Sequence, residues 1–472
     1  MIHRHHEHEP DRPDTGRVTS RWRAVGLVAM TGLALTAAGV AVPSAANAVA
    51  HTPTSIGPDR PNRSFTDDDR GEHDDGKHDD TDRTKNDKGK TKKARKPKAI
   101  PVPCNTDKLI AAITLANARG GAVLDLAKDC TYLLTANIDG AGLPAVTTPI
   151  TLNGGDKNTT IKRAPGAEQF RILTVDIGGY LTLNHLTITG GQTTGDGGGI
   201  LVNAGAAAAI GHSKILNNIS SQNGGGISSS GTTHLKNSTV KGNISSSRGG
   251  GIENTGTLTL RQSNIKTNSA SVAGGVQHGI PGGIPTSGTL TIISSNVAGN
   301  QAQRHGGMLI STGTGMIKDS KVVRNISLTG SGIASAAQLT LLDSRVVDNV
   351  ATGGVGGGML LAANSATSIR NSILEGNVSL TGGGIYNEGE LTVAWTKIVD
   401  NQTTTLGGGG IYNRSTGMVN LFATKVIKNI AATDGGGIFN EAGGTVNLNT
   451  ATGTVIVRNR PNNCFNVPGC FG

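Results

Sequence analysis

One six-residue pattern recurs ten times between residues 213 and 459: Ser or Thr, any residue, an aliphatic residue, two further residues, then Asn. Its first copy runs from Ser213 through Ile215 to Asn218. Regular recurrence of this kind indicates stacked structural repeats. We expect the asparagine amides to bond to one another along the stack, a structural role rather than a catalytic one. The ladder asparagines are Asn218, Asn243, Asn268, Asn300, Asn325, Asn349, Asn377, Asn401, Asn429 and Asn459.

A glycine cluster followed by an apolar residue marks each repeat, and successive clusters lie about 26 residues apart. With 70 glycines and only 3% aromatic residues, the chain lacks the large side chains that a wide core needs. The glycines supply turn conformations that other residues rarely adopt. The clear clusters are 197–200, 224–227, 249–252, 356–359, 382–385, 408–411 and 435–438, and weaker copies stand at 274–276, 306–308 and 330–333.

A coil of about 26 residues fits three short strands joined by turns, each stacked on the next coil at about 4.8 Å. The alternation in Thr257-Leu258-Thr259-Leu260 points aliphatic residues inward and polar residues outward. We therefore predict an all-β fold, a right-handed parallel β-helix solenoid of ten or more coils over residues 148–459.

The paired elements resemble the repeats of the polymorphic outer membrane protein family, which combine Gly-Gly-aliphatic with Phe-x-x-Asn. Here the Phe position is aliphatic, as in Ile265 to Asn268 and Val346 to Asn349. The resemblance covers about residues 180 to 460 and implies a secreted or cell-surface passenger-like β-helix of a family associated with adhesion. No apolar tail or sortase-type Leu-Pro motif follows Asn459, so we expect no self-anchoring by these routes.

Residues 1–48 have the order of a signal peptide: a basic leader with Arg21 and Arg23, an apolar stretch from Ala24 to Val42, and small residues ending at Ala48. We expect cleavage after Ala48 and a secreted protein, with no membrane span in the mature chain. An uncleaved N-terminal anchor is the alternative, because the apolar stretch approaches membrane-spanning length.

Residues 49–100 contain almost no large apolar side chain and read as a disordered, charged linker. Acidic residues crowd positions 67–82, and basic residues crowd 83–98. The segment is either a solvated spacer or a contact for an anionic envelope polymer.

Both ends of a solenoid need caps, because each exposes core and strand edges. Residues 101–147 are predicted to form the N-terminal cap, with a helix beginning at Asp107 and ending at Arg119. One cysteine pair, Cys104 and Cys130, brackets this helix, and residues 460–472 form a tail with the second pair, Cys464 and Cys470. Four cysteines allow three pairings, and we expect the one in which each cysteine bonds to its near neighbour in the sequence. Free thiols or a metal site are the alternative.

Acidic residues at matching positions in successive coils would indicate polysaccharide chemistry. Asp348 and Asp400 are separated by a glycine coil, and Glu388 and Glu441 skip the coil that carries Arg414. No motif resembles those of pectate lyases or polygalacturonases. We expect no catalytic residue, no metal, no cofactor and no nucleic-acid partner, and we expect a monomer.

One coil is irregular, because residues 273–287 insert extra residues, including Pro281 and Pro285. Insertions in solenoids form loops on one face, often the functional one. We place His278 in this loop and predict a small basic patch for an acidic glycan, with an ordinary exposed loop as the alternative. The patch residues are Arg248, His278, Arg304 and His305.

Two function classes follow. The first is a non-catalytic secreted or cell-surface protein that binds a polysaccharide, an anionic cell-envelope polymer, or a host or neighbouring cell surface. The second is a polysaccharide lyase or glycoside hydrolase of the pectin-lyase-like fold.

Overall fold

The computed structural model describes residues 98–155, 159–280, 282 and 288–471. The predicted signal peptide and nearly all of the predicted linker lie outside these residues, as do Pro281 and Pro285. No helix within the described ranges is long and apolar enough to cross a membrane.

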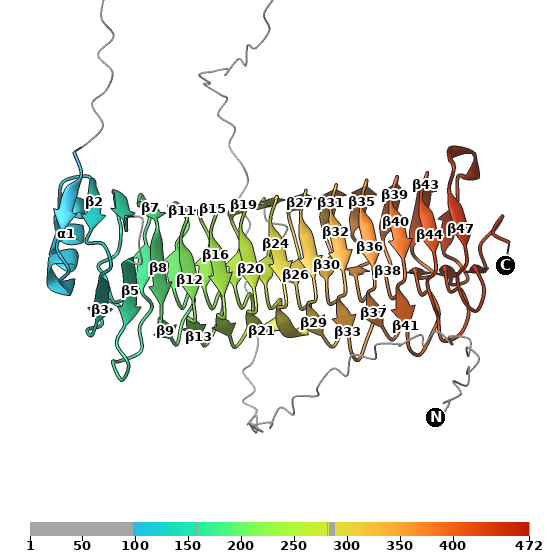
Figure 1. Cartoon of the computed structure of the whole chain (residues 1–472), viewed down its shortest axis with the longest axis horizontal. Coiled ribbons are helices and arrows are strands. Elements are labelled where there is room, and N and C mark those ends of the chain that lie inside the picture. Colours follow the sequence, from blue (N-terminus) through green and yellow to red (C-terminus); the bar gives the residue numbers. More distant parts are fainter. Residues whose placement is uncertain (1–97, 156–158, 281, 283–287, 472) are drawn as a thin grey trace, which may run out of the picture. The chain divides into compact units, whose positions relative to one another are not determined.

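The described residues form a parallel β-solenoid of about 13 turns, with strands stacked in sheets of 14, 13, 9 and 12 strands (Figure 1). This confirms the predicted fold. The prediction of three strands per coil was wrong, because a fourth, mostly two-residue strand follows the ladder asparagine in most coils. We number the sheets 1 to 4 in the order in which the chain passes through them.

Sheet 1 comprises β1 (Ile100–Val102), β2 (Ala122–Leu126), β4 (Pro149–Asn153), β7 (Tyr180–Asn184), β11 (Ala207–Gly211), β15 (Thr232–Lys236), β19 (Thr257–Arg261), β23 (Thr289–Ile293), β27 (Thr314–Lys318), β31 (Gln338–Leu342), β35 (Ala366–Arg370), β39 (Glu390–Ala394), β43 (Met418–Phe422) and β46 (Thr445–Asn447). Sheet 2 comprises β3 (Thr131–Leu134), β5 (Thr159–Arg163), β8 (Leu186–Thr189), β12 (Lys214–Leu216), β16 (Thr239–Lys241), β20 (Asn264–Lys266), β24 (Asn296–Ala298), β28 (Lys321–Val323), β32 (Arg345–Val347), β36 (Ile373–Glu375), β40 (Lys397–Val399), β44 (Lys425–Ile427) and β47 (Val455–Val457).

Sheet 3 comprises β9 (Gln192–Thr193), β13 (Ile219–Ser220), β17 (Ile244–Ser245), β21 (Ser269–Val272), β25 (Gln301–Arg304), β29 (Ile326–Ser327), β33 (Val350–Ala351), β37 (Val378–Ser379) and β41 (Gln402–Thr403). Sheet 4 comprises β6 (Leu173–Val175), β10 (Ile200–Val202), β14 (Ile227–Ser229), β18 (Ile252–Asn254), β22 (Val276–His278), β26 (Met308–Ile310), β30 (Ile333–Ser335), β34 (Met359–Leu361), β38 (Ile385–Asn387), β42 (Ile411–Asn413), β45 (Ile438–Asn440) and β48 (Cys464–Phe465).

Helix α1 (Thr106–Ala118) covers the N-terminal end, as the cap prediction required (Figure 1). The side chain of Asn105 accepts a hydrogen bond from the Lys108 backbone N–H, which caps the first turn. Leu109 and Ile113 are fully buried in the main core. The Cys104–Cys130 disulfide joins the residues before the helix to the first coil.

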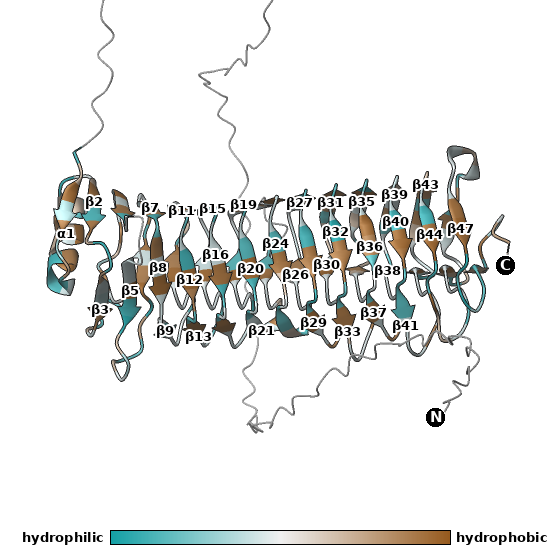
Figure 2. Ribbon diagram, in the orientation of Figure 1, coloured by the Kyte–Doolittle hydropathy of each residue, from teal (hydrophilic) through white to brown (hydrophobic). Residues whose placement is uncertain are grey.

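The core is a narrow column of aliphatic side chains, because each strand contributes only one or two inward residues. In β19, Leu258 and Leu260 are fully buried while Thr257 and Thr259 face outward, and Figure 2 shows the resulting alternation of hydropathy along the strands. Pairing is in register between coils, so Leu260 lies beside Ile292 of the next coil.

The ten asparagines named above form one buried stack. The side-chain Nδ2 of each of the first nine donates to the Oδ1 of the ladder asparagine in the next coil, as from Asn325 to Asn349 at 3.0 Å, and Asn459 donates to the Oδ1 of Asn463. The Oδ1 of Asn349 also accepts the backbone N–H of Asn325, and Asn325 Nδ2 also donates to the backbone carbonyl of Val297. The stack therefore satisfies amide and backbone groups that burial has removed from water.

The glycine clusters lie in the turns between sheets 3 and 4, where coils approach closely. Gly249 has a φ of +64°, and a Cβ on Gly250 would collide with the carbonyl oxygens of Ser269 and Gly274. Glycine is therefore required there both by the backbone conformation and by the spacing of the coils.

Candidate functional site

Part of the predicted basic patch is wrong. His278 does not lie in the inserted loop; it is the last residue of β22, and it is fully buried. Its Nδ1 lies 2.9 Å from Nδ2 of Asn254 in the preceding coil, and burial lowers its pKa. The alternation of β22 turns this side chain inward, so His278 contacts no ligand on the surface.

Arg248 and Arg304 lie in one column with Val272 between them, because Val272 pairs with both. Arg248 Nε donates to the side-chain oxygen of Asn223 at 3.3 Å. The pKa of His305 is lowered to about 4 by burial and by the charge of Arg304, so this imidazole is neutral at pH 7. Of the four predicted patch residues, only Arg248 and Arg304 therefore carry a positive charge at pH 7, and Val272 separates them.

A buried glutamate that the sequence did not single out lies on the outer side of sheet 4. Glu253 occupies the middle position of β18 and is only 8% exposed. Burial raises its pKa to about 7, and its Oε2 accepts a hydrogen bond from Ser228 Oγ at 2.8 Å. It is the one charged residue at the middle position of the described sheet 4 strands. An alignment of the coils on their sheet 4 strands could have identified Glu253, because it is a charged residue at a position that is otherwise uncharged in these strands.

Aromatic rings occupy the same column of sheet 4 nearer the C-terminus. Tyr386, Tyr412, Phe439 and Phe465 stack in parallel, with ring centroids 5.4, 4.8 and 4.6 Å apart. Because each inner ring has neighbours on both faces, the stack presents mainly ring edges. We interpret the stack as structural, because the rings pack against one another from coil to coil on the outer side of sheet 4.

The structure shows the surroundings of three carboxylates considered from the sequence. Glu441 is held in an ion pair with Arg414 at 3.2 Å, and it accepts a 2.7 Å hydrogen bond from the Tyr412 hydroxyl. Asp348 and Asp400 are both exposed turn residues with a φ of 54°. Within the described residues, no group of three or more His, Cys, Asp or Glu could hold a metal ion.

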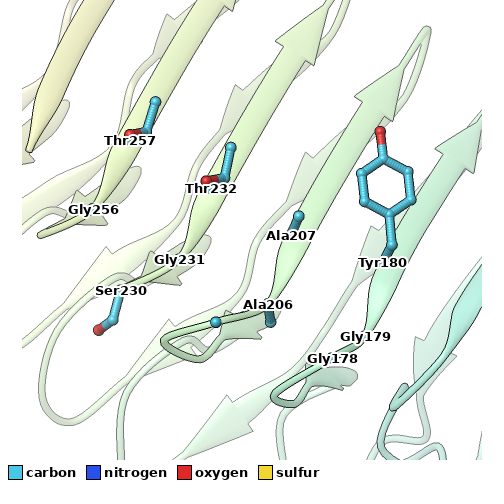
Figure 3. Close-up of a pocket in the computed structure, with 11 residues that line it drawn as sticks. Gly178, Gly179, Tyr180, Ala206, Ala207, Ser230, Gly231, Thr232, Gly256 and Thr257 are labelled. Carbon is cyan, nitrogen blue, oxygen red and sulfur yellow. The ribbon is translucent and has the colours of Figure 1, made fainter. Parts of the chain in front are cut away.

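A shallow groove crosses the turns between sheets 4 and 1 (Figure 3). Its volume is about 550 Å³, and small residues such as Gly205, Ala206 and Gly231 form its floor. The ring of Tyr180 stands at one end, while Thr232 and Thr257 line the strands beyond (Figure 3). Tyr180 is the one ionisable residue among those that line this groove.

Positive charge runs along the outer side of sheet 2, from the ends of the sheet 1 strands to the turns that follow sheet 2, and we call this surface the basic edge. Cations stand there at the last position of sheet 1 strands, at outward positions of sheet 2 strands, and in the turns that follow sheet 2. The basic edge comprises Lys214, Lys236, Lys241, Arg261, Lys266, Lys318, Lys321, Arg324, Arg345, Arg370, Lys397, Lys425, Lys428 and Arg458.

Strand register places like charges side by side on this edge. Lys236 pairs with Arg261, and Lys241 pairs with Lys266, so four cations occupy two adjacent coils. Lys321 beside Arg345 and Lys397 beside Lys425 repeat the arrangement. Such neighbours are about 4.8 Å apart along the stack, and like charges at that spacing repel.

Few carboxylates offset these charges. In the part of the chain that the structure describes, the basic edge contains one ion pair, Arg345 with Glu375 at 2.7 Å, and both partners are well exposed. The other acidic residues of the basic edge, Asp319, Asp343, Asp348 and Asp400, all lie C-terminal to Lys266. From Lys214 to Lys266, the strands of sheets 1 and 2 and the turns between them contain no Asp or Glu.

The fold and this edge define the class: a parallel β-solenoid whose described residues carry a line of exposed positive charge along sheet 2, with few neighbouring carboxylates. No protein-family model matches the chain, so the expected polymorphic outer membrane protein repeat is not shown. No curated protein matches either. Among solved structures, the A-module of the mannuronan C-5 epimerase AlgE6 of Azotobacter vinelandii is similar, at 15% identity and a TM-score of 0.41, over 72% of this chain and 94% of that module. We draw nothing about function from this likeness.

Proposed function

We propose that the chain is a non-catalytic β-helix that binds a linear anionic polymer, a polysaccharide or a cell-envelope polymer, along the basic edge. The observation that carries the proposal is the row of exposed or half-buried cations that repeats with the strand spacing and lacks neighbouring carboxylates between Lys214 and Lys266. A polymer with regularly spaced negative charges would relieve this repulsion at many coils at once.

The proposed location is outside the cytoplasm, as a secreted or cell-surface monomer. Both cysteine pairs form disulfides, Cys104 with Cys130 and Cys464 with Cys470, and disulfides persist in oxidising compartments. Binding such a polymer on a host or neighbouring cell would give the protein an adhesive role.

The test compares two full-chain variants that remove the same number of positive charges. One neutralises the four cations of adjacent coils, Lys236→Gln, Lys241→Gln, Arg261→Gln and Lys266→Gln. The matched control neutralises exposed cations elsewhere, Lys108→Gln, Arg119→Gln, Lys128→Gln and Arg460→Gln. Binding to immobilised polygalacturonate is measured against neutral dextran.

We expect the edge variant to raise the Kd for polygalacturonate by about 10-fold or more, since each lost contact removes one favourable charge interaction. The control should stay within about 3-fold of wild type, because long-range attraction is screened at physiological salt. Equal losses in both variants would show that total charge, and not the basic edge, governs binding.

A polysaccharide lyase or hydrolase is the second candidate, and Glu253 is the observation that favours it. A carboxyl group with a pKa of about 7 is suited to proton transfer at neutral pH. The polysaccharides tested for binding are therefore also assayed for reducing ends and unsaturated products, with and without Ca²⁺. Product release that Glu253→Gln abolishes would replace the binding proposal with an enzymatic one.

A further inference from the structure

A second groove, of about 470 Å³, opens at the corner between sheets 1 and 2, beside the basic edge and near the C-terminal end of the solenoid. Trp395 lies in its wall, in the turn that follows β39, with 56% of its surface exposed. Its φ of 50° is unusual for a bulky residue. Large exposed aromatic side chains in a concave site are characteristic of ligand contacts.

Positive charge and hydroxyl groups surround this indole. Arg370, one coil earlier, lies over one face of the Trp395 ring, with its guanidinium carbon 4.9 Å from the ring centroid. Ser368 and Thr392 line the groove from neighbouring sheet 1 strands, and Thr452 closes it at the η1 turn (Thr450–Thr452). The groove thus combines a stacking surface, a cation and hydrogen-bonding groups.

The neighbouring coil leaves room for a ligand. The turn position that Trp395 occupies is filled by Ala423 in the next coil, and both residues line the groove. Phe422 supplies a second aromatic side chain there. Its backbone carbonyl accepts a hydrogen bond from the backbone N–H of Trp395. In the other coils, this positive-φ turn position holds smaller residues, such as Asn371 and Asp343. The tryptophan is a local feature and not part of the repeat.

We propose that this groove, the Trp395 groove, is a subsite for a carboxylated sugar residue, a uronate, of the polymer that the basic edge binds. The inference rests on the proposed function and deepens it by naming the sugar class. The C–H face of a pyranose ring stacks on the indole face opposite Arg370, Arg370 pairs with the carboxylate, and the hydroxyls of Ser368 and Thr392 bond to the sugar hydroxyls. Lys397 and Lys425 of the basic edge lie on the adjoining coils, so one polymer chain can contact both.

The chain has two tryptophans, Trp22 and Trp395, so Trp22→Phe in the full-length protein leaves Trp395 as the single indole. Its fluorescence is titrated with oligogalacturonate, with maltohexaose as a neutral match and with inorganic polyphosphate as a phosphate match. We expect a saturable change with oligogalacturonate alone. An equal response to polyphosphate would overturn the assignment to a uronate.

Variants separate stacking from folding. Trp395→Ala should raise the Kd for oligogalacturonate at least 10-fold, and Trp395→Phe should retain part of the affinity because it keeps an aromatic face. The matched control is His212→Ala, at the same turn position in a distant coil. Circular dichroism shows whether each variant is folded, and Trp395→Phe carries the test if Trp395→Ala is not.

The outcomes distinguish this inference from the proposed function. If polygalacturonate binds through the basic edge while Trp395 fluorescence and the Trp395 variants leave binding unchanged, the subsite is wrong and the proposed function stands. If the protein binds no anionic polymer in either assay, both are wrong.

Discussion

At the residue scale, the ladder asparagines are buried and hydrogen-bonded from coil to coil. The ladder asparagines were predicted from the sequence because their spacing follows the coil length. Glu253 and the inward direction of His278 were not, because both depend on the register of sheet 4, whose strands are three residues long and mostly buried on both sides. A three-residue strand is too short to show an alternating pattern.

Asn325→Ala tests the ladder. The substitution removes a side chain that donates to Asn349 and Val297, and it leaves the Asn300 amide groups without their acceptor. We expect a loss of about 2–4 kcal/mol in unfolding free energy, measured by urea denaturation, because buried unpaired polar groups are costly. Asn264→Ala, on the outer side of β20, is the control and should change stability by less than about 0.5 kcal/mol. Similar losses at both positions would refute the structural role of the ladder.

Glu253→Gln tests the raised pKa. Because the folded-state pKa of about 7 exceeds the ordinary value of 4.5, the folded protein holds its proton more tightly than the unfolded chain. The favourable contribution is therefore full below pH 4.5 and is lost as pH rises through about 7. We expect wild type to lose about 3 kcal/mol relative to Glu253→Gln between pH 4.5 and 7.5, measured by denaturation at a series of pH values. Parallel pH profiles would contradict this account.

At the element scale, the solenoid is stabilised coil by coil and closed at each end by a disulfide. Both disulfide pairings and the helix of the cap were predicted from the sequence. The cysteines of each pair are close in sequence, and the helix is marked by its own capping residue and apolar positions, so both patterns are local. The fourth strand was not predicted, because a strand of two residues after each ladder asparagine is too short to show an alternation of apolar and polar residues.

Removing each disulfide tests the caps. The Cys104–Cys130 bridge closes a loop of 26 residues, whereas Cys464–Cys470 closes one of 6. In the loop-entropy model, we expect a loss of about 3.5 kcal/mol for the first double Cys→Ser variant and about 2 kcal/mol for the second. Thermal unfolding and limited proteolysis of the ends measure the difference, and the reverse order would contradict a loop-entropy origin.

At the scale of the whole molecule, stacking turns residues far apart in sequence into neighbours on one edge. Lys236 and Arg261 are 25 positions apart, as are Lys241 and Lys266, and this interval equals one coil. The 25-residue spacing of these cations is visible in the sequence. It shows that they are neighbours only once the register of each strand is known. The predicted patch near the insertion was sought in an irregular coil, whereas the stronger charge lies along the regular ones.

The basic edge runs from Lys214 to Arg458 over about 40 Å at the spacing of stacked strands. The most direct test of the account is the Kd of the full-length protein for oligogalacturonates of increasing length. If the polymer lies along the edge, the Kd should fall steadily with each added sugar and level off once the oligomer spans the edge, at about eight residues, and the gain should shrink in high salt. A Kd that is the same for a dimer and a decamer would contradict binding along the edge.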